Sequence, residues 1–214
     1  MERLNCSHDP NRFENCSEDL EKLFVATLNQ LRHDWMNEIQ VMYGYLQLKK
    51  YDKMYEFMET IKQRIARDSS VSRLGAPRLV LYLSTFRVRH KSVSLEVELE
   101  PGLQLTSLPV NQRSVTDTVV QVGETFVRHA GVPDSGGVNN LLLALSAHPG
   151  YLKLVFEYTG AYIGKALDRD LQAVQEAGRE VPGFAFSGTY SEEKAVVTIQ
   201  IPFDREDEVC HVSG

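Results

Sequence analysis

His33 is the residue of this sequence that is best placed to do chemistry, because helical periodicity puts it opposite an apolar stripe. The stripe consists of large apolar residues at helical spacing, namely Phe24, Leu28, Leu31, Trp35, Ile39, Met42 and Leu46. At roughly 100° per residue, His33 lies about 150° from the middle of that stripe. Part of an imidazole population is uncharged near neutral pH, so an outward-facing histidine offers a nucleophilic ring nitrogen. The alternative for such a position is a solvated histidine without a function.

Polar or small residues continue the exposed row on both sides of this histidine. The row reads Gln30, His33, Asn37, Gln40 and Gly44. A carboxamide therefore lies one turn from the ring, and no bulky side chain covers the helix further along. Arg32 and Asp34 flank the apolar stripe and are candidates for contacts inside a bundle or with a partner.

Two long helices joined by a short turn are predicted to carry this row. Residues 1–18 are polar and predict a loose tail, and acidic residues after Ser17 indicate a helix start. The first helix is expected to run to about Lys49, and Asp52 is a candidate N-cap for a second helix over 53–73. Together, residues 19–74 predict an antiparallel helical hairpin.

A hairpin of this length cannot bury the apolar stripes of both helices by itself. The second helix has its own stripe, Met54, Phe57, Met58, Ile61 and Ile65, with Val71 a weaker member. Pairing with a second copy would satisfy both stripes in a four-helix bundle, so we expect a homodimer. The alternative is that the hairpin packs on the rest of its own chain.

The segment Leu74-Gly75-Ala76-Pro77 interrupts the helical pattern and marks a domain boundary. Beyond it we expect an α+β two-layer sandwich over residues 77–203, followed by a polar tail over 204–214. Helices are predicted at 78–90, 111–129 and 166–177. Strands are predicted at 93–99, 141–147, 151–158, 184–190 and 194–202, with His148-Pro149-Gly150 as a hairpin turn. His90, His129 and His148 lie at element ends and carry no predicted catalytic role.

Composition and charge exclude several classes of function. The 214 residues carry a net charge of −6, which disfavours non-specific nucleic-acid binding. No apolar run is long enough to span a membrane and the N-terminus does not resemble a secretory signal, so we expect a cytoplasmic protein. The three cysteines suit a reducing compartment better than a disulfide framework. The spacing of Cys6, His8 and Cys16 matches no usual zinc pattern, so we predict no metal site.

The helical motif resembles the sporulation-initiation phosphotransferase B family of two-component phosphorelays. The residues that carry the resemblance are Leu31-Arg32-His33-Asp34-Trp35-Met36-Asn37, then Gln40, Gly44, Leu46, Leu48 and Lys50-Tyr51-Asp52. The family implies a dimeric four-helix bundle, a second domain shaped like a histidine-kinase ATPase domain, and phosphoryl transfer between the receiver domains of two response regulators. Only His33 carries over as the phosphorylated residue. Asn37 is a candidate for orienting the ring or contacting the phosphoryl group, and Gln30, Asp34, Gln40 and Gly44 are candidates for partner binding.

Within the second domain, the positions that bind nucleotide in histidine kinases are altered. Gln121 and Thr125 stand where kinases supply asparagines to Mg²⁺-ATP. Tyr158 replaces the adenine-reading aspartate, and Tyr162 replaces a glycine at which the backbone approaches the nucleotide. The resemblance therefore implies no intrinsic cofactor, with Mg²⁺ supplied by the receiver domain of the partner. Two rival functions remain, a soluble histidine kinase that still uses ATP and a non-catalytic dimeric scaffold for response regulators.

Overall fold

The computed structural model of the protein describes residues 10–133 and 137–204. The chain divides into two compact units, residues 1–59 and 60–214. The division falls inside the second helix and therefore earlier than the boundary expected at 74–77. The end of that helix belongs with the second unit, because Val71, and Leu74 just beyond the helix, are buried in the core of this unit.

Helix α1 spans Pro10–Gln47 and begins before the expected start at Ser17. Proline suits the first position of a helix, since its missing N–H would have no partner there and its φ is already helical. The predicted loose tail over 1–18 is thus wrong for residues 10–18, which are helical. Residues 1–9 lie outside the described part of the chain.

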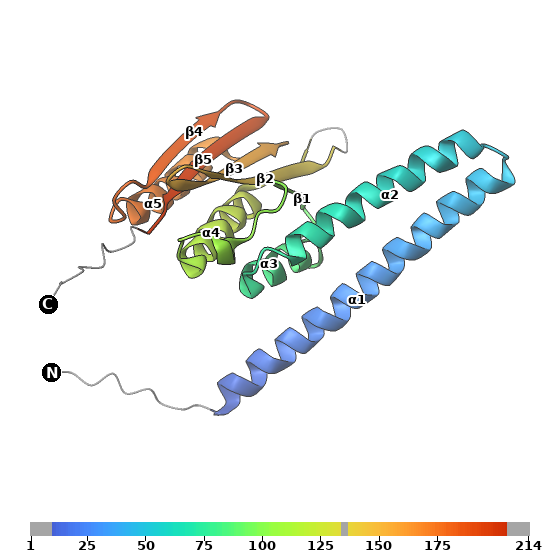
Figure 1. Ribbon diagram of the computed structural model, residues 1–214, viewed down its shortest axis with the longest axis horizontal. Helices are drawn as coiled ribbons and strands as arrows, with labels where there is room; N and C mark the ends of the chain where they lie inside the picture. The colour runs from blue at the N-terminus through green and yellow to red at the C-terminus, as the bar shows by residue number, and fades with distance from the viewer. Residues whose placement is uncertain (1–9, 134–136, 205–214) are drawn as a thin grey trace, which may run out of the picture. The chain divides into compact units, whose positions relative to one another are not determined.

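A tight turn reverses the chain between α1 and helix α2, which spans Tyr51–Ser72 (Figure 1). Lys49 has φ 54°, and Lys50 N–H donates to Tyr45 O at 2.9 Å, the bonding of a helix C-cap with a left-handed residue. The rings of Tyr45 and Phe57 meet edge to face at 6.2 Å beside this turn. Asp52 lies in the first turn of α2 and does not cap it, because the helix begins one residue earlier.

In its described residues, the second unit contains three further α-helices and one sheet. The helices are α3 (Pro77–Arg89), α4 (Gln112–His129) and α5 (Gly164–Gly178), with the short 3₁₀ segment η1 (Leu105–Ser107) before α4. Asn111 caps α4 by accepting from the backbone N–H groups of Arg113 and Ser114. The strands are β1 (Val93–Leu99), β2 (Asn139–His148), β3 (Tyr151–Thr159), β4 (Ala185–Tyr190) and β5 (Lys194–Pro202). These elements agree with the predicted ones to within about two residues at their ends.

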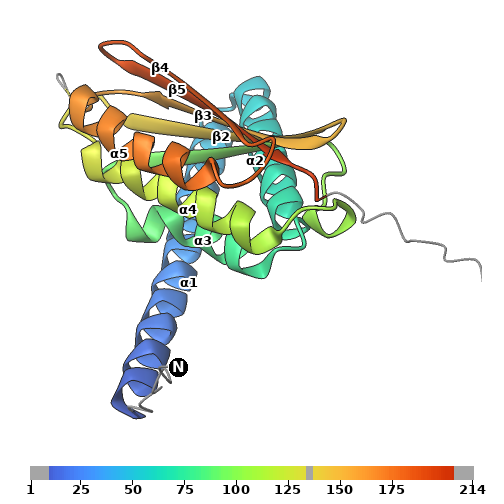
Figure 2. The same cartoon turned by 90° about the vertical axis from the view of Figure 1, so that its left-hand side faces the viewer.

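The five strands lie in the order β1-β2-β3-β5-β4. β1 pairs with β2 in parallel, and every other pairing is antiparallel. Helices α3, α4 and α5 cover one face of the sheet (Figure 2). The predicted fold class, a helical hairpin followed by an α+β two-layer sandwich, is confirmed.

Strict alternation along the central strands builds the core of this unit. Residues Leu152, Leu154, Phe156 and Tyr158 of β3 are at most 1% exposed, whereas the residues between them are half-buried on the other face. Val119, Val122 and Phe126 of α4 are equally buried and belong to the same cluster.

Candidate functional site

The side chain of His33 lies on the surface of α1 and is 69% exposed. Asn37 Nδ2 lies 3.1 Å from His33 Nδ1, so the predicted neighbour one turn away is in hydrogen-bonding contact with the ring. Asp34 Oδ1 is 3.8 Å from the same ring nitrogen. Among the side chains that the structure describes, none forms a hydrogen bond with His33 Nε2.

Asp34 is held in place by a residue on the same helix. Gln30 Nε2 donates to Asp34 Oδ1 at 2.9 Å, and the Asp34 side chain is only 21% exposed. The structure therefore joins four of the predicted site residues, Gln30, His33, Asp34 and Asn37, in one chain of polar contacts. Sequence reasoning did not predict the Gln30–Asp34 bond, although the i,i+4 spacing of an amide and a carboxylate signals it.

The contact with Asn37 is compatible with either neutral tautomer of the His33 ring. When Nδ1 is unprotonated, it accepts a hydrogen bond from the Asn37 amide group. When Nδ1 carries the proton, the amide turns over and its oxygen accepts, and the nearby Asp34 carboxylate favours this tautomer. The lone pair is then on Nε2, which is the nitrogen without a partner in the described structure.

Among the described residues, no side-chain hydrogen bond or ion pair joins Gln40 or Gly44 to this group. They lie 7 and 11 residues beyond His33 and hence about 10 and 16 Å further along the helix axis. A Cβ atom at Gly44 would meet nothing within 4 Å, and its φ is not positive. Glycine inside a helix costs roughly 1 kcal/mol relative to alanine. Neither packing nor backbone geometry within the chain therefore requires a glycine here.

The apolar stripe of α1 is uncovered in a single chain. Its members Phe24, Leu28, Leu31, Trp35, Ile39 and Leu46 are 44–62% exposed, and Met42 is half-buried. On α2, Met58 and Ile65 are 46% and 55% exposed. The stripe lies on a different side of α1 from His33, as the helical periodicity predicted. Within a single chain, these apolar side chains remain largely exposed.

Of the four positions that the resemblance relates to nucleotide binding, Thr125 and Tyr158 are buried, Tyr162 is half-buried and Gln121 is exposed. Thr125 is 3% exposed and donates its hydroxyl to Gln121 O at 2.7 Å. Tyr158 is fully buried, its ring stacks on Phe126 at 5.4 Å, and its hydroxyl donates to Ala161 O. Burial raises the pKa of Tyr158 to about 12, so the phenol stays neutral.

The loop after β3 is closed onto the end of α4. Gly131 N–H donates to Ala161 O at 2.8 Å, and Ile163 N–H donates to His129 O at 3.1 Å. The Tyr162 hydroxyl donates to Ser191 O on the other side. Backbone groups of this loop thus bond the end of α4, and the Tyr162 hydroxyl bonds the turn before β5.

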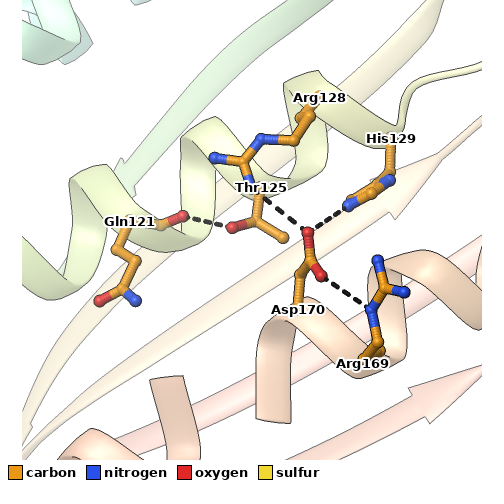
Figure 3. Close-up of polar contacts among 6 residues, drawn as sticks. All are labelled: Gln121, Thr125, Arg128, His129, Arg169 and Asp170. Carbon is orange, nitrogen blue, oxygen red and sulfur yellow. Dashed lines mark hydrogen bonds and ion pairs between the residues drawn. The ribbon is translucent and has the colours of Figure 1, made fainter. Parts of the chain in front are cut away.

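A carboxylate on α5 joins this helix to α4 (Figure 3). Asp170 Oδ2 lies 2.8 Å from His129 Nε2 and 3.2 Å from Arg128 Nη1, and Arg169 Nε lies 3.2 Å from Oδ1. The His129 hydrogen bond lowers the pKa of Asp170 below its usual value, partial desolvation opposes this, and Arg169 adds to the lowering. His129, which had no predicted role, therefore has a structural one.

No cluster of three or more metal-ligating side chains occurs in the described part of the chain. The residues considered for zinc, Cys6, His8 and Cys16, lie outside the described side chains. Within residues 10–133 and 137–204, none of the helices has the length and apolar character that crossing a bilayer requires.

The hairpin is similar to a known family of proteins. Residues 16–74 match the family model for the alpha-helical domain of SpoOB-type sensor kinases. Sporulation initiation phosphotransferase B of Bacillus subtilis (strain 168) is 34% identical over 90 residues, which are 42% of this chain and 47% of that protein. The chain thus matches about half the length of this curated relative. The predicted resemblance to this family is confirmed over the hairpin.

Solved histidine kinases are similar at a lower level. The histidine kinase AdeS of Acinetobacter baumannii is 14% identical, with 81% of this chain and 98% of that chain covered, at a TM-score of 0.42. The histidine kinase ThkA, solved in complex with the response regulator protein TrrA, is 14% identical, with 90% and 66% covered, at a TM-score of 0.44. Structural similarity at these TM-scores does not show the activity or the partners of this protein.

Proposed function

We propose, from the SpoOB-type alpha-helical domain of residues 16–74, that the protein is a phosphorelay phosphotransferase. His33 accepts a phosphoryl group from the aspartyl phosphate of one response-regulator receiver domain. It then passes the group to the aspartate of a second response regulator that controls sporulation initiation. The observation that carries this proposal is the exposed imidazole of His33. Its Nδ1 is in hydrogen-bonding contact with Asn37, and no described side chain forms a hydrogen bond with its Nε2.

In the proposed step, the Nε2 lone pair of His33 attacks the phosphorus atom of the aspartyl phosphate. An N–P bond forms, the P–O bond to the acyl oxygen breaks, and the aspartate leaves as a carboxylate with the electron pair. The Nδ1 proton stays on the ring, and the resulting positive charge is stabilised by the Asp34 carboxylate 3.8 Å away. Asn37 keeps the ring oriented, since phosphoryl transfer depends mainly on in-line positioning. The second transfer is the same step in reverse.

Charge neutralisation at the phosphoryl group is assigned to the partner. The receiver domain brings Mg²⁺ in its own acidic pocket, and this chain supplies no cofactor. Tyr158 stacked on Phe126, and the loop closed over the end of α4, support the loss of ATP binding and hence of autokinase activity. The phosphoryl group must then come from another protein.

The uncovered stripes on α1 and α2 support a homodimer with a four-helix bundle. Two copies of His33 would then lie on the outside of the bundle. The row Gln30, Asn37, Gln40 and Gly44 forms the docking strip for the receiver domains. Gly44 permits a close approach of the partner, which accounts for a glycine that the chain itself does not require. We assign the protein to the cytoplasm, with no nucleic-acid or membrane partner.

The test is transfer of label from a phosphorylated receiver domain to the purified protein. We expect label on the wild type and on His148→Ala, a control that alters a histidine of the second unit. We expect His33→Ala to accept at least about 1,000-fold less, because the nucleophile is gone. Equal labelling of His33→Ala, or no labelling of the wild type, would overturn the proposal. The second result would favour the scaffold, and labelling from ATP alone would favour the kinase.

A further inference from the structure

Gln30 forms a contact that its place in the docking strip does not explain. Its Nε2 donates to Oδ1 of Asp34, one turn further along α1, at 2.9 Å. Gln30 is half-buried, whereas Asn37 and Gln40 of the same row are exposed. The amide of Gln30 is therefore engaged within its own helix, before any partner is bound.

The oxygen atom that Gln30 binds is also the one that faces the histidine. Asp34 Oδ1 lies 2.9 Å from Gln30 Nε2 and 3.8 Å from His33 Nδ1. The Asp34 side chain is 21% exposed, and the imidazole is 69% exposed. The Gln30 amide is thus linked to the reactive ring through one shared carboxylate oxygen.

A hydrogen bond to this oxygen restricts the rotation of the Asp34 side chain. An aspartate on a helix surface can occupy more than one staggered rotamer. A hydrogen bond between an amide and a charged carboxylate favours the rotamer in which it forms, and the i,i+4 spacing suits a Gln–Asp pair. The bond therefore keeps Oδ1 close to Nδ1, and this matters because the attraction between two charges falls as their distance grows.

We propose that Gln30 is a positioning residue for phosphoryl transfer and acts on His33 through Asp34. This inference rests on the proposed function of His33. With Oδ1 held near the ring, the proton of the neutral imidazole stays on Nδ1, so the lone pair that attacks phosphorus is on Nε2. The same carboxylate stabilises the positive charge that the ring acquires when the N–P bond forms and the P–O bond breaks. Gln30 thus contributes to the transfer step itself, beyond its place in the docking strip.

The test removes the hydrogen bond and keeps the helix. Gln30→Met retains the length of the side chain and loses the donor, and Asp34→Ala removes the residue through which Gln30 acts. Methionine and alanine are both good helix formers, so α1 is preserved. Gln172→Met is the matched control, because Gln172 Nε2 of α5 donates to Asp168 Oδ2 at 3.3 Å with the same spacing in the second unit.

The first measurement examines the ring in the full-length protein without any partner. With nitrogen-15-labelled histidine, the chemical shifts of Nδ1 and Nε2 report which nitrogen carries the proton at about pH 9, where an ordinary imidazole is neutral. His33→Ala assigns the signals. We expect mainly the Nδ1–H tautomer in the wild type, and a shift of about twofold toward Nε2–H in Gln30→Met but not in Gln172→Met. An unchanged tautomer ratio in Gln30→Met would overturn the proposal, whether or not the protein transfers phosphoryl groups.

The second measurement separates transfer from docking. Single-turnover transfer from a phosphorylated receiver domain, followed over a range of receiver concentrations, gives the rate at saturation and the half-saturating concentration. We expect Gln30→Met to lower the rate at saturation about threefold, and to lower it no further in the Asp34→Ala background.

Two kinetic results would contradict the proposal. If Gln30→Met changes only the half-saturating concentration, Gln30 is a docking residue alone. If it causes the same loss of rate in the Asp34→Ala background, Gln30 acts without Asp34. A wild type that accepts no label would refute the proposed function instead, and the tautomer ratio would then decide whether Gln30 positions the ring.

Discussion

Trp35 of α1 is 61% exposed, whereas Phe156 of β3 is 1% exposed, and this contrast separates the two parts of the molecule. In the sheet unit, alternating side chains of the central strands are packed under α3, α4 and α5 within a single chain. In α1, large apolar residues at helical spacing lie uncovered, and an exposed histidine lies on another side of the same helix. The sheet unit therefore satisfies its own packing, whereas the hairpin leaves its apolar stripe uncovered. Four substitutions test this contrast.

Phe156→Ala should have the largest effect, and this effect should be confined to the stability of the sheet unit. Removing a buried phenylalanine costs about 3–5 kcal/mol, because its packing is lost and a cavity remains. Urea unfolding of the sheet unit should show this loss, whereas Trp35→Ala should leave the same transition within about 0.5 kcal/mol. A large loss for Trp35→Ala in the sheet transition would mean that the hairpin stripe packs on its own chain.

Trp35→Asp should weaken self-association. If a second copy covers the stripe, a buried charge replaces a central aromatic residue, and the dimer should weaken by at least about 2 kcal/mol, roughly 30-fold in Kd. Sedimentation equilibrium over a range of concentrations measures this. Lys22→Asp, on the exposed polar side of the same helix, is the control. A wild type that stays monomeric would contradict the four-helix bundle.

Asn37→Ala should slow phosphoryl transfer without abolishing it. The variant loses the 3.1 Å contact with His33 Nδ1, and one net hydrogen bond of about 1.4 kcal/mol corresponds to about a tenfold lower rate. Single-turnover transfer at saturating receiver domain separates this from weaker docking. Asn29→Ala alters an exposed asparagine whose side chain, in the described part of the chain, accepts a hydrogen bond from Arg32, and this variant should keep the wild-type rate. An unchanged rate for Asn37→Ala would show that the ring needs no such support.

Asp170→Asn should have the smallest effect, seen in the pH dependence of stability. The His129 bond lowers the pKa of Asp170 in the folded state, so its stabilisation is present above the unfolded-state value. It is lost as the pH falls through the lower folded-state value. The unfolding free energy of the wild type should thus fall more between pH 6 and pH 3 than that of Asp170→Asn. Asp117→Asn, whose ion pairs are 3.9–4.0 Å long, should resemble the wild type. If the unfolding free energy of Asp170→Asn falls with pH as steeply as that of the wild type, other groups cause the pH dependence.

Much of the fold was predictable because local patterns report local structure. The alternation of 93–99 and 194–202 matches β1 and β5 residue for residue, and the turn at His148-Pro149-Gly150 joins β2 and β3. The start of α1 was predicted too late, because the acidic residues after Ser17 outweighed Pro10 as a start signal. The order of the strands was not predicted, since pairing of β3 with β5 joins segments separated by a helix and an edge strand.

For the candidate site, the sequence by itself determined that His33 faces outward and that Asn37 neighbours it. Both follow from the helical repeat, which is a property of adjacent turns. Only the tertiary structure could join Asp170 to His129 across 41 residues and stack Tyr158 on Phe126, because chain folding alone brings these groups together.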